Sequence, residues 1–293
     1  MALRRTLAAL IVILGTSSPL AAQKKIERRM PLGMEGALRI VNMVGSVVVH
    51  GWAKDTVMLR GTMSPADRFY GGGAYTGVKF GIESATNADP GPARLEIWVP
   101  SRARLWVKTA TANIDVSGVE GGLDLYVVSG TIDVTGDPRE LNAEAIDGDI
   151  HIIGSPSWVR AKSASGAVTF RGASSDAGFS TVSGAVHVEG GTFERTRIET
   201  VTGDISFSGR LDRSGAFDFD THSGNIDIAV PEKTSASLSV VSIAGTITNT
   251  LSDKSPVAGR FGRGAELYTD VNGGGAKVSV RTFKGPVTLR RLK

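Results

Sequence analysis

Six polar side chains near the middle of the chain have the types and the spacing that chemistry would need. They come in pairs two residues apart, and the pairs recur every eighteen residues: Asn113 and Asp115, Thr131 and Asp133, and Asp149 and His151. If each pair stands on its own β-strand, the pairs lie roughly 5 Å from one another. That spacing would let neighbouring side chains share a cation or a polar ligand, so these six residues are the candidate binding site.

No catalytic or metal-binding signature accompanies these residues. The sequence contains no GxSxG, HExxH, GxxxxGK[ST] or GxGxxG motif. His151 and His187 share a position in the repeat but are two strands, roughly 10 Å, apart, so they cannot ligate one metal ion. Polar residues on the solvent side of a strand are common in structural clusters. We therefore predict no catalytic residue, no metal and no cofactor, and a protein that is not an enzyme.

The element that must position the six residues is a repeated motif. Four copies align without gaps on Gly130, Gly148, Gly166 and Gly184. Looser copies place further residues at the same motif position: Gly45, Ala112, Gly203, Gly224, Gly245 and Gly285. Self-similarity at a fixed period is the signature of a stacked-repeat protein.

Each repeat reads as two β-strands joined by two glycine corners. Apolar residues alternate at two and four positions after the motif glycine, and at seven and five positions before it, as on half-buried strands. Three positions before it stand small polar residues such as Ser163, Thr181 and Thr200, whose hydroxyls could hydrogen-bond one another or the turn backbone. Six positions after it comes a second glycine, as at Gly136 and Gly154, where we expect a positive φ.

These features predict an all-β fold, a parallel β-helix (β-solenoid) of about ten coils of 18–21 residues. One coil cannot bury its apolar side alone, so neighbouring coils must stack and share a core. Stepping by six residues from Ile132 lands on Pro138 and Glu144, which excludes the left-handed hexapeptide helix. We expect two principal sheets and right-handed winding.

The regularity divides the chain into four segments. Residues 1–22 read as a signal peptide, 23–104 as an N-terminal cap with the first irregular coils, 105–250 as the regular solenoid, and 251–293 as a loop insertion with a C-terminal closing coil. The glycine-rich residues 68–77 predict a mobile loop. Short basic clusters near both ends predict solvated tails: Lys24, Lys25, Arg28 and Arg29, and Arg290, Arg291 and Lys293.

One apolar column does not fit the alternation of a half-buried strand. Two residues before the motif glycine stand Val128, Ile146, Ala164, Val182, Val201 and Ile243. We expect the chain to bend there so that these side chains also point inward, because monomers seldom expose long apolar patches. An exposed stripe would instead mark a surface for a partner or for self-association.

The composition limits the environment and the partners. Arg4, Arg5 and an apolar run that ends at Ala22 predict a secretory signal cleaved after Ala22, and no later segment is apolar enough to span a membrane. There is no cysteine, so neither disulfides nor a lipidated amino-terminal cysteine contributes. Removing residues 1–22 lowers the formal charge from +4 to +2, because 31 Lys and Arg then face 29 Asp and Glu. That balance does not favour a nucleic-acid partner.

The repeated Thr-Val-Ser-Gly pattern at residues 181–188, with its variant at 200–207, follows a secretion signal and resembles the bacterial putative-adhesin family of unknown function. The segment 38–47, with the Gly51-Trp52 that follows it, shares this likeness, which covers about residues 36–290. The resemblance implies a parallel β-helix on the exported side of the membrane. It brings no catalytic residues to this chain.

Three functions are consistent with these observations. The first is an exported, noncatalytic solenoid, periplasmic or at the cell surface, that acts as an adhesin-like module and binds an envelope or extracellular glycan or a protein surface. The second is an enzyme acting on acidic polysaccharide through Asp115, Asp133 and Asp149. The third is a self-assembling structural rod. The sequence favours the first and leaves the oligomeric state open.

Overall fold

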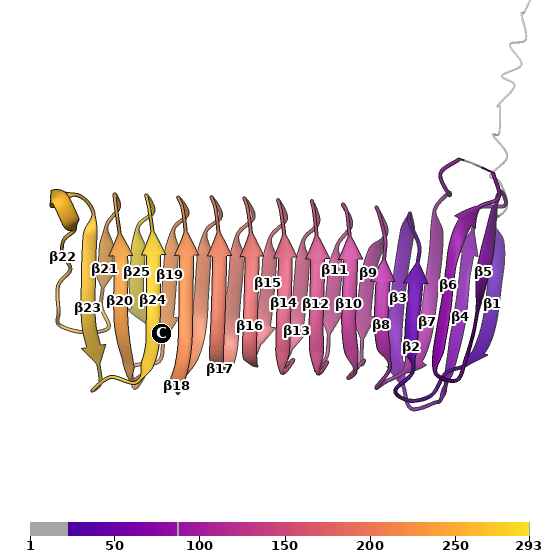
Figure 1. The fold of residues 1–293 in the computed structure, drawn as a ribbon, viewed down its shortest axis with the longest axis horizontal. Helices are drawn as coiled ribbons and strands as arrows, with labels where there is room; N and C mark the ends of the chain where they lie inside the picture. The colour runs from indigo at the N-terminus through magenta and orange to yellow at the C-terminus, as the bar shows by residue number, and fades with distance from the viewer. Residues whose placement is uncertain (1–22, 87, 293) are drawn as a thin grey trace, which may run out of the picture.

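The computed structural model describes residues 23–86 and 88–292, and the predicted signal peptide lies outside them. Within those residues every regular element is a β-strand, except for a short 3-10 turn at Arg260–Gly262. Figure 1 shows an elongated rod in which the strands lie across the long axis. The predicted all-β class is confirmed.

The strands that follow the motif glycine, together with β7, form one parallel row, which we call row A. In spatial order, row A contains β7 (Ala93–Pro100), β3 (Gly45–Trp52), β9 (Asn113–Ser117), β11 (Ile132–Thr135), β13 (Ile150–Gly154), β15 (Val168–Gly172), the first parts of β17 (Val186–Thr200) and β18 (Ile205–Thr221), β19 (Ile226–Val230), β25 (Val287–Arg291) and β21 (Ile247–Asn249).

The strands that precede the motif glycine, together with β6, form the second parallel row, row B. In spatial order, row B contains β6 (Gly77–Ser84), β2 (Ala37–Val41), β8 (Arg104–Lys108), β10 (Gly122–Val127), β12 (Glu140–Ala145), β14 (Trp158–Ser163), β16 (Ser174–Thr181), the second parts of β17 and β18, β24 (Ala276–Thr282) and β20 (Ala236–Ser242).

The register of both rows follows the sequence period. Ile132 is the partner of Ile114 on one side and of Ile150 on the other, so residues eighteen apart are spatial neighbours as predicted. The described residues contain eleven stacked coils, against about ten expected, because β6 and β7 of the irregular N-terminal segment add one.

The core lies between the two rows, where the inward columns of each strand meet. Its centre holds a series of phenylalanine rings. The ring centroid of Phe193 lies 5.9 Å from that of Phe170 and 5.3 Å from that of Phe207. The centroid of Phe207 lies 5.4 Å from that of Phe219. All four are at most 1% exposed. Burying one such side chain fully is worth about 1.5–3 kcal/mol, and this burial stabilises a fold that has no disulfide.

The two glycine columns meet different needs. At most corners six residues after the motif glycine the backbone has positive φ, as predicted, with values of 136° at Gly136 and 147° at Gly172, but Gly51 and Gly209 do not adopt it. Apart from Gly45, with a φ of 113°, the motif glycines have no such φ, but they lie against a neighbouring coil, and a Cβ on Gly148 would overlap the carbonyl oxygen of Gly130. Glycine is therefore required there by the close approach of two coils.

The small polar column three residues before the motif glycine forms the hydrogen bonds that the sequence suggested. Thr200 Oγ1 donates to the carbonyl oxygen of Gly203 (2.6 Å) and contacts Thr221 Oγ1 at 2.7 Å. Ser163 Oγ donates to the carbonyl oxygen of Gly148 in the preceding coil (3.0 Å). These buried hydroxyls link each turn to itself and to its neighbour.

Thr196 in the same strand, β17, provides a test of this role. Its side chain is 1% exposed and its Oγ1 has no hydrogen-bond partner among the described residues. Thr196→Val keeps the shape and removes an unsatisfied hydroxyl, so we expect a gain of about 1 kcal/mol in the free energy of unfolding. Thr200→Val removes a bonded hydroxyl and should cost about 1–2 kcal/mol. Urea unfolding of both variants measures the difference, and equal effects would contradict this assignment.

The order of the coils departs from the sequence order at both ends. The last coil, β24 and β25, lies between β18 and β20 in row B and between β19 and β21 in row A. At the other end β2 lies between β6 and β8, and β3 between β7 and β9. The expectation that the C-terminal coil closes the rod is therefore wrong. Every coil offers similar edges and inward residues, so the repeat pattern does not specify which coils become neighbours.

Antiparallel strands cover both ends of the rod (Figure 1). At the N-terminal end β4 (Thr56–Met63) pairs with β7 and with β1 (Lys24–Pro31), and β5 (Asp67–Ala74) pairs with β6. At the C-terminal end β23 (Ala265–Val271) pairs with β20 and with β22 (Val257–Ala258). Such pairing protects the open sheet edges.

Two expectations about the chain ends are corrected by these caps. The glycine-rich segment 68–77 forms most of the β5–β6 hairpin, and the basic residues near the N-terminus belong to strand β1, with their side chains still exposed. Arg290 Nε donates to Asp227 Oδ1 at 2.9 Å, and Arg291 is paired with Glu232. Strand pairing and ion pairs therefore replace the expected solvated tails, whereas Lys293 lies outside the described residues.

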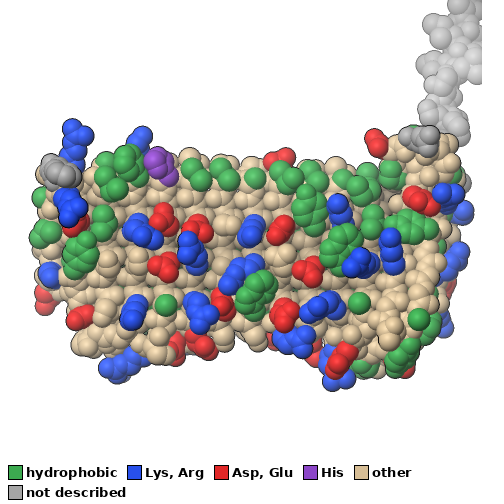
Figure 2. All heavy atoms as spheres, viewed as in Figure 1, with side chains coloured by type: hydrophobic (Ala, Val, Ile, Leu, Met, Phe, Trp, Pro, Cys, Tyr) green, Lys and Arg blue, Asp and Glu red, His purple; other side chains and the backbone are tan. Residues whose placement is uncertain are grey.

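The apolar column before the motif glycine is exposed, contrary to the expected inward bend. Ile146, Val182, Val201 and Ile243 are 43–53% exposed, and Phe283, the equivalent residue of the last coil, is 41% exposed. The alternation of row B continues through this position, so the side chain after the inward hydroxyl must point outward. Figure 2 shows the resulting line of hydrophobic side chains along the upper edge of the rod. We call this line the apolar ridge.

Candidate functional site

The structure brings the predicted polar residues together on row A. Asp115, Asp133 and His151 are register partners on β9, β11 and β13. Thr131 Oγ1 donates to Asp133 Oδ2 at 3.2 Å. Thr169 separates His151 from His187, as predicted.

Two of the six predicted residues have a structural task. Asn113 Oδ1 accepts a hydrogen bond from the backbone N–H of Thr131 (3.1 Å), and Asp149 Oδ1 accepts one from that of Ala167 (2.7 Å). Each side chain thus binds the next coil eighteen residues on. The recurrence of Asn or Asp directly after the motif glycine was the signal for this task, and the sequence reasoning did not use it.

The described part of the chain holds no group of three or more His, Cys, Asp or Glu residues placed to bind a metal ion. The predicted residues of row A form a row of polar side chains on the sheet. A hollow with more elaborate chemistry lies on the other row.

A groove of about 740 Å³ runs over the outer face of row B, from β8 to β18. The arrangement of side chains near its centre depends on one glycine. Gly178 stands in the outward column between Arg160 and Arg197, its register partners on the two neighbouring strands. A Cβ at Gly178 would lie 2.6 Å from Cδ of Arg160, so the arginine side chain occupies the space that the glycine leaves.

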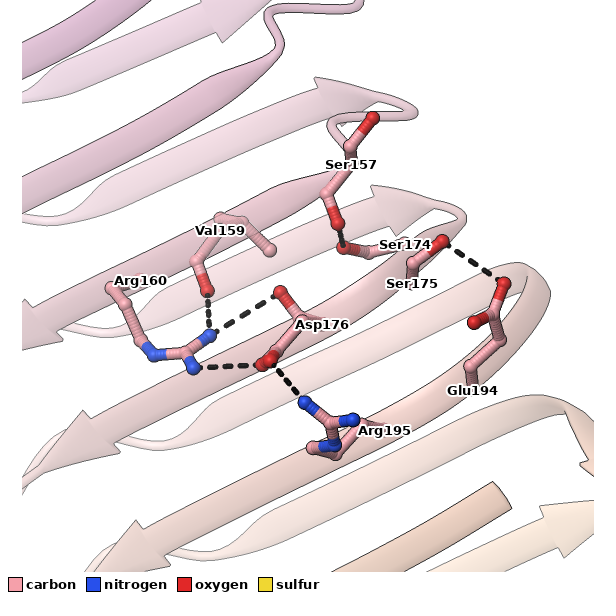
Figure 3. A network of polar contacts seen from close by, with 8 residues as sticks. All are labelled: Ser157, Val159, Arg160, Ser174, Ser175, Asp176, Glu194 and Arg195. Atoms are coloured by element: carbon pink, nitrogen blue, oxygen red, sulfur yellow. Dashed lines mark hydrogen bonds and ion pairs between the residues drawn. The ribbon is translucent and has the colours of Figure 1, made fainter. Parts of the chain in front are cut away.

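Arg160 is held in place from several directions, as Figure 3 shows. Its Nη2 donates to Asp176 Oδ1 at 2.7 Å, and its Nη1 donates to the carbonyl oxygens of Val159 and Asp176. The guanidinium carbon lies 4.7 Å from the centroid of the Trp158 ring. Such a guanidinium is already ordered before a ligand arrives, so binding costs less side-chain entropy.

Asp176 connects a second arginine to the first. Arg195 Nη1 donates to Asp176 Oδ2 at 2.8 Å, so one carboxylate bridges two guanidinium groups (Figure 3). The side chains of Asp176 and Arg160 are 24% and 30% exposed, whereas that of Arg195 is 70% exposed. The guanidinium of Arg195 is therefore exposed to solvent, while the carboxylate that it contacts is held in place by Arg160.

Arg197 and Glu199 form the neighbouring pair in the groove, with Arg197 Nη2 donating to Glu199 Oε1 at 2.6 Å. This hydrogen bond is the main cause that holds the pKa of Glu199 below its ordinary value, and the charges of Arg197 and Arg281 act in the same direction. The pair is half exposed, so it contributes little to stability.

The lowered pKa of Glu199 gives a pH dependence with a definite sign. A carboxyl whose folded pKa is depressed stabilises the native state above its unfolded pKa, and this contribution is lost as the pH falls through the folded pKa. Glu199→Gln should therefore be less stable than the wild type at neutral pH, by at most about 1 kcal/mol, and the difference should close in acid. Thermal unfolding from neutral pH into the acid range checks this. A constant difference at every pH would contradict it.

A second, smaller hollow of about 230 Å³ lies beside the groove over β8, β10 and β12. It shares Asp124 and Asn142 with the larger one. Trp106 and Tyr126 line it, and Trp106 is 36% exposed. The two hollows form one groove that crosses successive coils along the rod.

The alternation along β14 and β17 places Arg160, Lys162 and Arg197 on outward columns, but this pattern does not predict a groove. The missing signal was Gly178, the member of an outward column that has no side chain. The cluster around Asp176 was missed because its partner on β17, Arg195, lies nineteen and not eighteen residues further on.

The chain belongs to the Toastrack DUF4097 family, whose sequence profile matches residues 141–290. This confirms the resemblance seen in the repeated motif. No curated protein matches the chain. In the described residues, no helix is both long and apolar enough to cross a membrane.

Two solved structures are similar to this chain. One is a putative cell adhesion protein from Clostridium sporogenes, at 9% identity and a TM-score of 0.23, with 92% of this chain and 100% of that chain covered. The other is a putative adhesin from Bacteroides fragilis, at 9% identity and a TM-score of 0.38, with 93% and 99% covered.

Proposed function

We propose that this protein is an exported, noncatalytic binding module with an adhesin-like role at the cell surface or envelope. Its scaffold is a right-handed parallel β-helix, and its binding site is the row B groove. The observation that carries the proposal is the ordered Arg160–Asp176–Arg195 cluster, which stands in a groove on a rigid sheet. Polar groups fixed in a concave site are typical of ligand binding.

Binding to the envelope of the producing cell tests this function. The purified protein should cosediment with the envelope fraction in a saturable way. Arg160→Ala and Arg195→Ala should weaken this binding about tenfold, which corresponds to about 1.4 kcal/mol. The matched control is Arg171→Ala, which removes an exposed arginine paired with Glu189 on row A. Absence of saturable binding, or equal loss in the control, would contradict the proposal.

The enzymatic alternative is tested in the same preparation. An enzyme acting on acidic polysaccharide would release new unsaturated ends from uronate polymers, whereas a binding module releases none. Asp149 accepts a backbone hydrogen bond from Ala167, which occupies one of the three carboxylates that such an enzyme would use.

The apolar ridge favours a self-assembling rod as a second candidate function. It would join copies side by side, because antiparallel strands cover both ends and oppose end-to-end growth. Sedimentation that shows only monomer at high protein concentration would remove this candidate. Oligomers that are present in the wild type and absent in the Val182→Ser and Val201→Ser variants would support it.

A further inference from the structure

The groove runs along the long axis of the rod. Its two hollows meet at Asp124 and Asn142, and together they cross the row B strands from β8 to β18. Parallel neighbours are spaced by roughly 4.8 Å, so a groove that crosses the strands from β8 to β18 runs along the rod. It therefore suits an extended chain that lies across the strands.

The floor of the groove excludes recognition by strand addition. β14 is paired with β12 on one side and with β16 on the other, and the same holds for each strand along the centre of the groove. A peptide that binds as an added strand needs a free sheet edge. Recognition in this groove must come from side chains that stand above the sheet.

The charges of those side chains cancel. The cations are Arg104, Arg160, Lys162, Arg195 and Arg197, and the carboxylates are Asp124, Glu140, Asp176, Glu199 and Asp218. Most of these cations already have a carboxylate partner within 3.4 Å. Figure 2 shows acidic and basic side chains mixed over this face. A polyanion would meet no net positive field here and would have to displace the existing pairs.

What the groove offers is planar hydrogen-bonding groups beside aromatic rings. Guanidinium, carboxylate and amide groups can each bind two adjacent hydroxyls, as donors or acceptors. Trp106, Tyr126 and Trp158 line the groove. A cation already lies over each ring, namely Arg39, Lys108 and Arg160 respectively, so the C–H face of a sugar would pack against the ring surface that these cations leave exposed. A pyranose unit in an extended chain advances by about one strand spacing, so successive units would meet successive coils.

We propose that the groove binds a neutral, linear polysaccharide laid along the rod. The inference rests on the proposed binding function of the same groove and names its ligand class. Arg160 and Asp176 hold Arg195 in place, so that its guanidinium faces the polysaccharide, and the aromatic residues pack against the sugar rings.

Isothermal titration of the full exported chain with neutral hexasaccharides tests this inference. The probes are cellohexaose, maltohexaose, mannohexaose and chitohexaose, with hexagalacturonate as the anionic comparison. At least one neutral probe should bind, and raising the salt from about 50 mM to about 300 mM should change its affinity less than twofold, because no net charge is neutralised. Its trisaccharide should bind more weakly, because it spans fewer coils.

Variants locate the binding. Trp158→Ala and Arg195→Ala should each weaken it about tenfold, and Arg171→Ala on row A should leave it unchanged. Arg195 is mostly exposed, so its variant should fold even if Trp158→Ala does not, and far-ultraviolet circular dichroism checks both.

The outcomes separate this inference from the proposed function. Failure of every neutral probe, or preference for hexagalacturonate with a steep salt dependence, would overturn the neutral-glycan inference. So would binding that survives both groove variants. If the envelope fraction still binds in an Arg195-dependent way, the proposed function stands and only the ligand class is wrong. Loss of envelope binding as well would overturn both.

Discussion

Gly172→Ala will lower the free energy of unfolding by about 3–5 kcal/mol. Two effects act together at this corner between β15 and β16. The backbone has a φ of 147°, which a residue with a Cβ seldom adopts, and the added carbon would overlap the carbonyl group of Gly154 in the preceding coil. The chain can relieve that overlap only by separating two coils, which breaks the hydrogen bonds between them.

Urea unfolding measures this loss, and Gly72→Ala is its matched control. Gly72 lies in β5, and an added Cβ there would have no heavy atom within 4 Å. We expect the control to stay within about 0.5 kcal/mol of the wild type. If the two variants have the same midpoint, the coils are not packed as closely as the structure shows.

Phe207→Ala will cost about 3–5 kcal/mol, because it removes the central ring of the core. Phe207 is fully buried and contacts the rings of Phe193 and Phe219 with centroid distances of 5.3 and 5.4 Å. The cavity would lie between two rows whose backbones are fixed by strand pairing on both sides, so the surrounding structure cannot collapse into it.

The control for this variant is Phe283→Ala. Phe283 belongs to the apolar ridge, is 41% exposed and stacks on His222 at 5.0 Å. Its removal should cost less than about 1 kcal/mol. Similar losses for both variants, measured by urea unfolding, would show that the core does not lie between the two rows.

The repeat was readable from the sequence because two short-range requirements recur in it. Alternating apolar residues such as Ile132 and Val134 mark the buried side of each strand, and corner glycines such as Gly136 mark the backbone that needs positive φ. Both requirements act within one coil or between adjacent coils. Their period therefore predicted the strands, the register and the corners.

The repeat period does not determine the order in which the terminal coils stack. β24 and β25 could pair in sequence order with β20 and β21 alone, yet they are inserted one coil further in. The linker that precedes them, Asn272 to Gly275, has positive φ at every residue. This turn returns the chain from the cap strand β23 to the inserted coil.

The candidate site was predicted only in part, for a related reason. Strand register gave the neighbours Asp115, Asp133 and His151 correctly. The groove instead depends on side-chain conformations, since Arg160 crosses Gly178 to reach Asp176. A column pattern shows which side chains face outward, but not how a long arginine side chain turns along the surface.

Disulfide trapping across the inserted coil tests the stacking order most directly. The chain has no cysteine, so an introduced pair has no competitor. Asp227 and Thr288 are partners on β19 and β25, and Thr288 is in turn the partner of Thr248 on β21. Neighbouring strands give a Cα separation that a disulfide accepts, whereas strands two apart do not.

After mild oxidation, the double variant Asp227→Cys with Thr288→Cys should lose both free thiols and form an intramolecular crosslink, detected by mass spectrometry. The double variant Asp227→Cys with Thr248→Cys should keep its thiols. The reverse result, a crosslink between positions 227 and 248 and none between 227 and 288, would show coils stacked in sequence order and would contradict the structure.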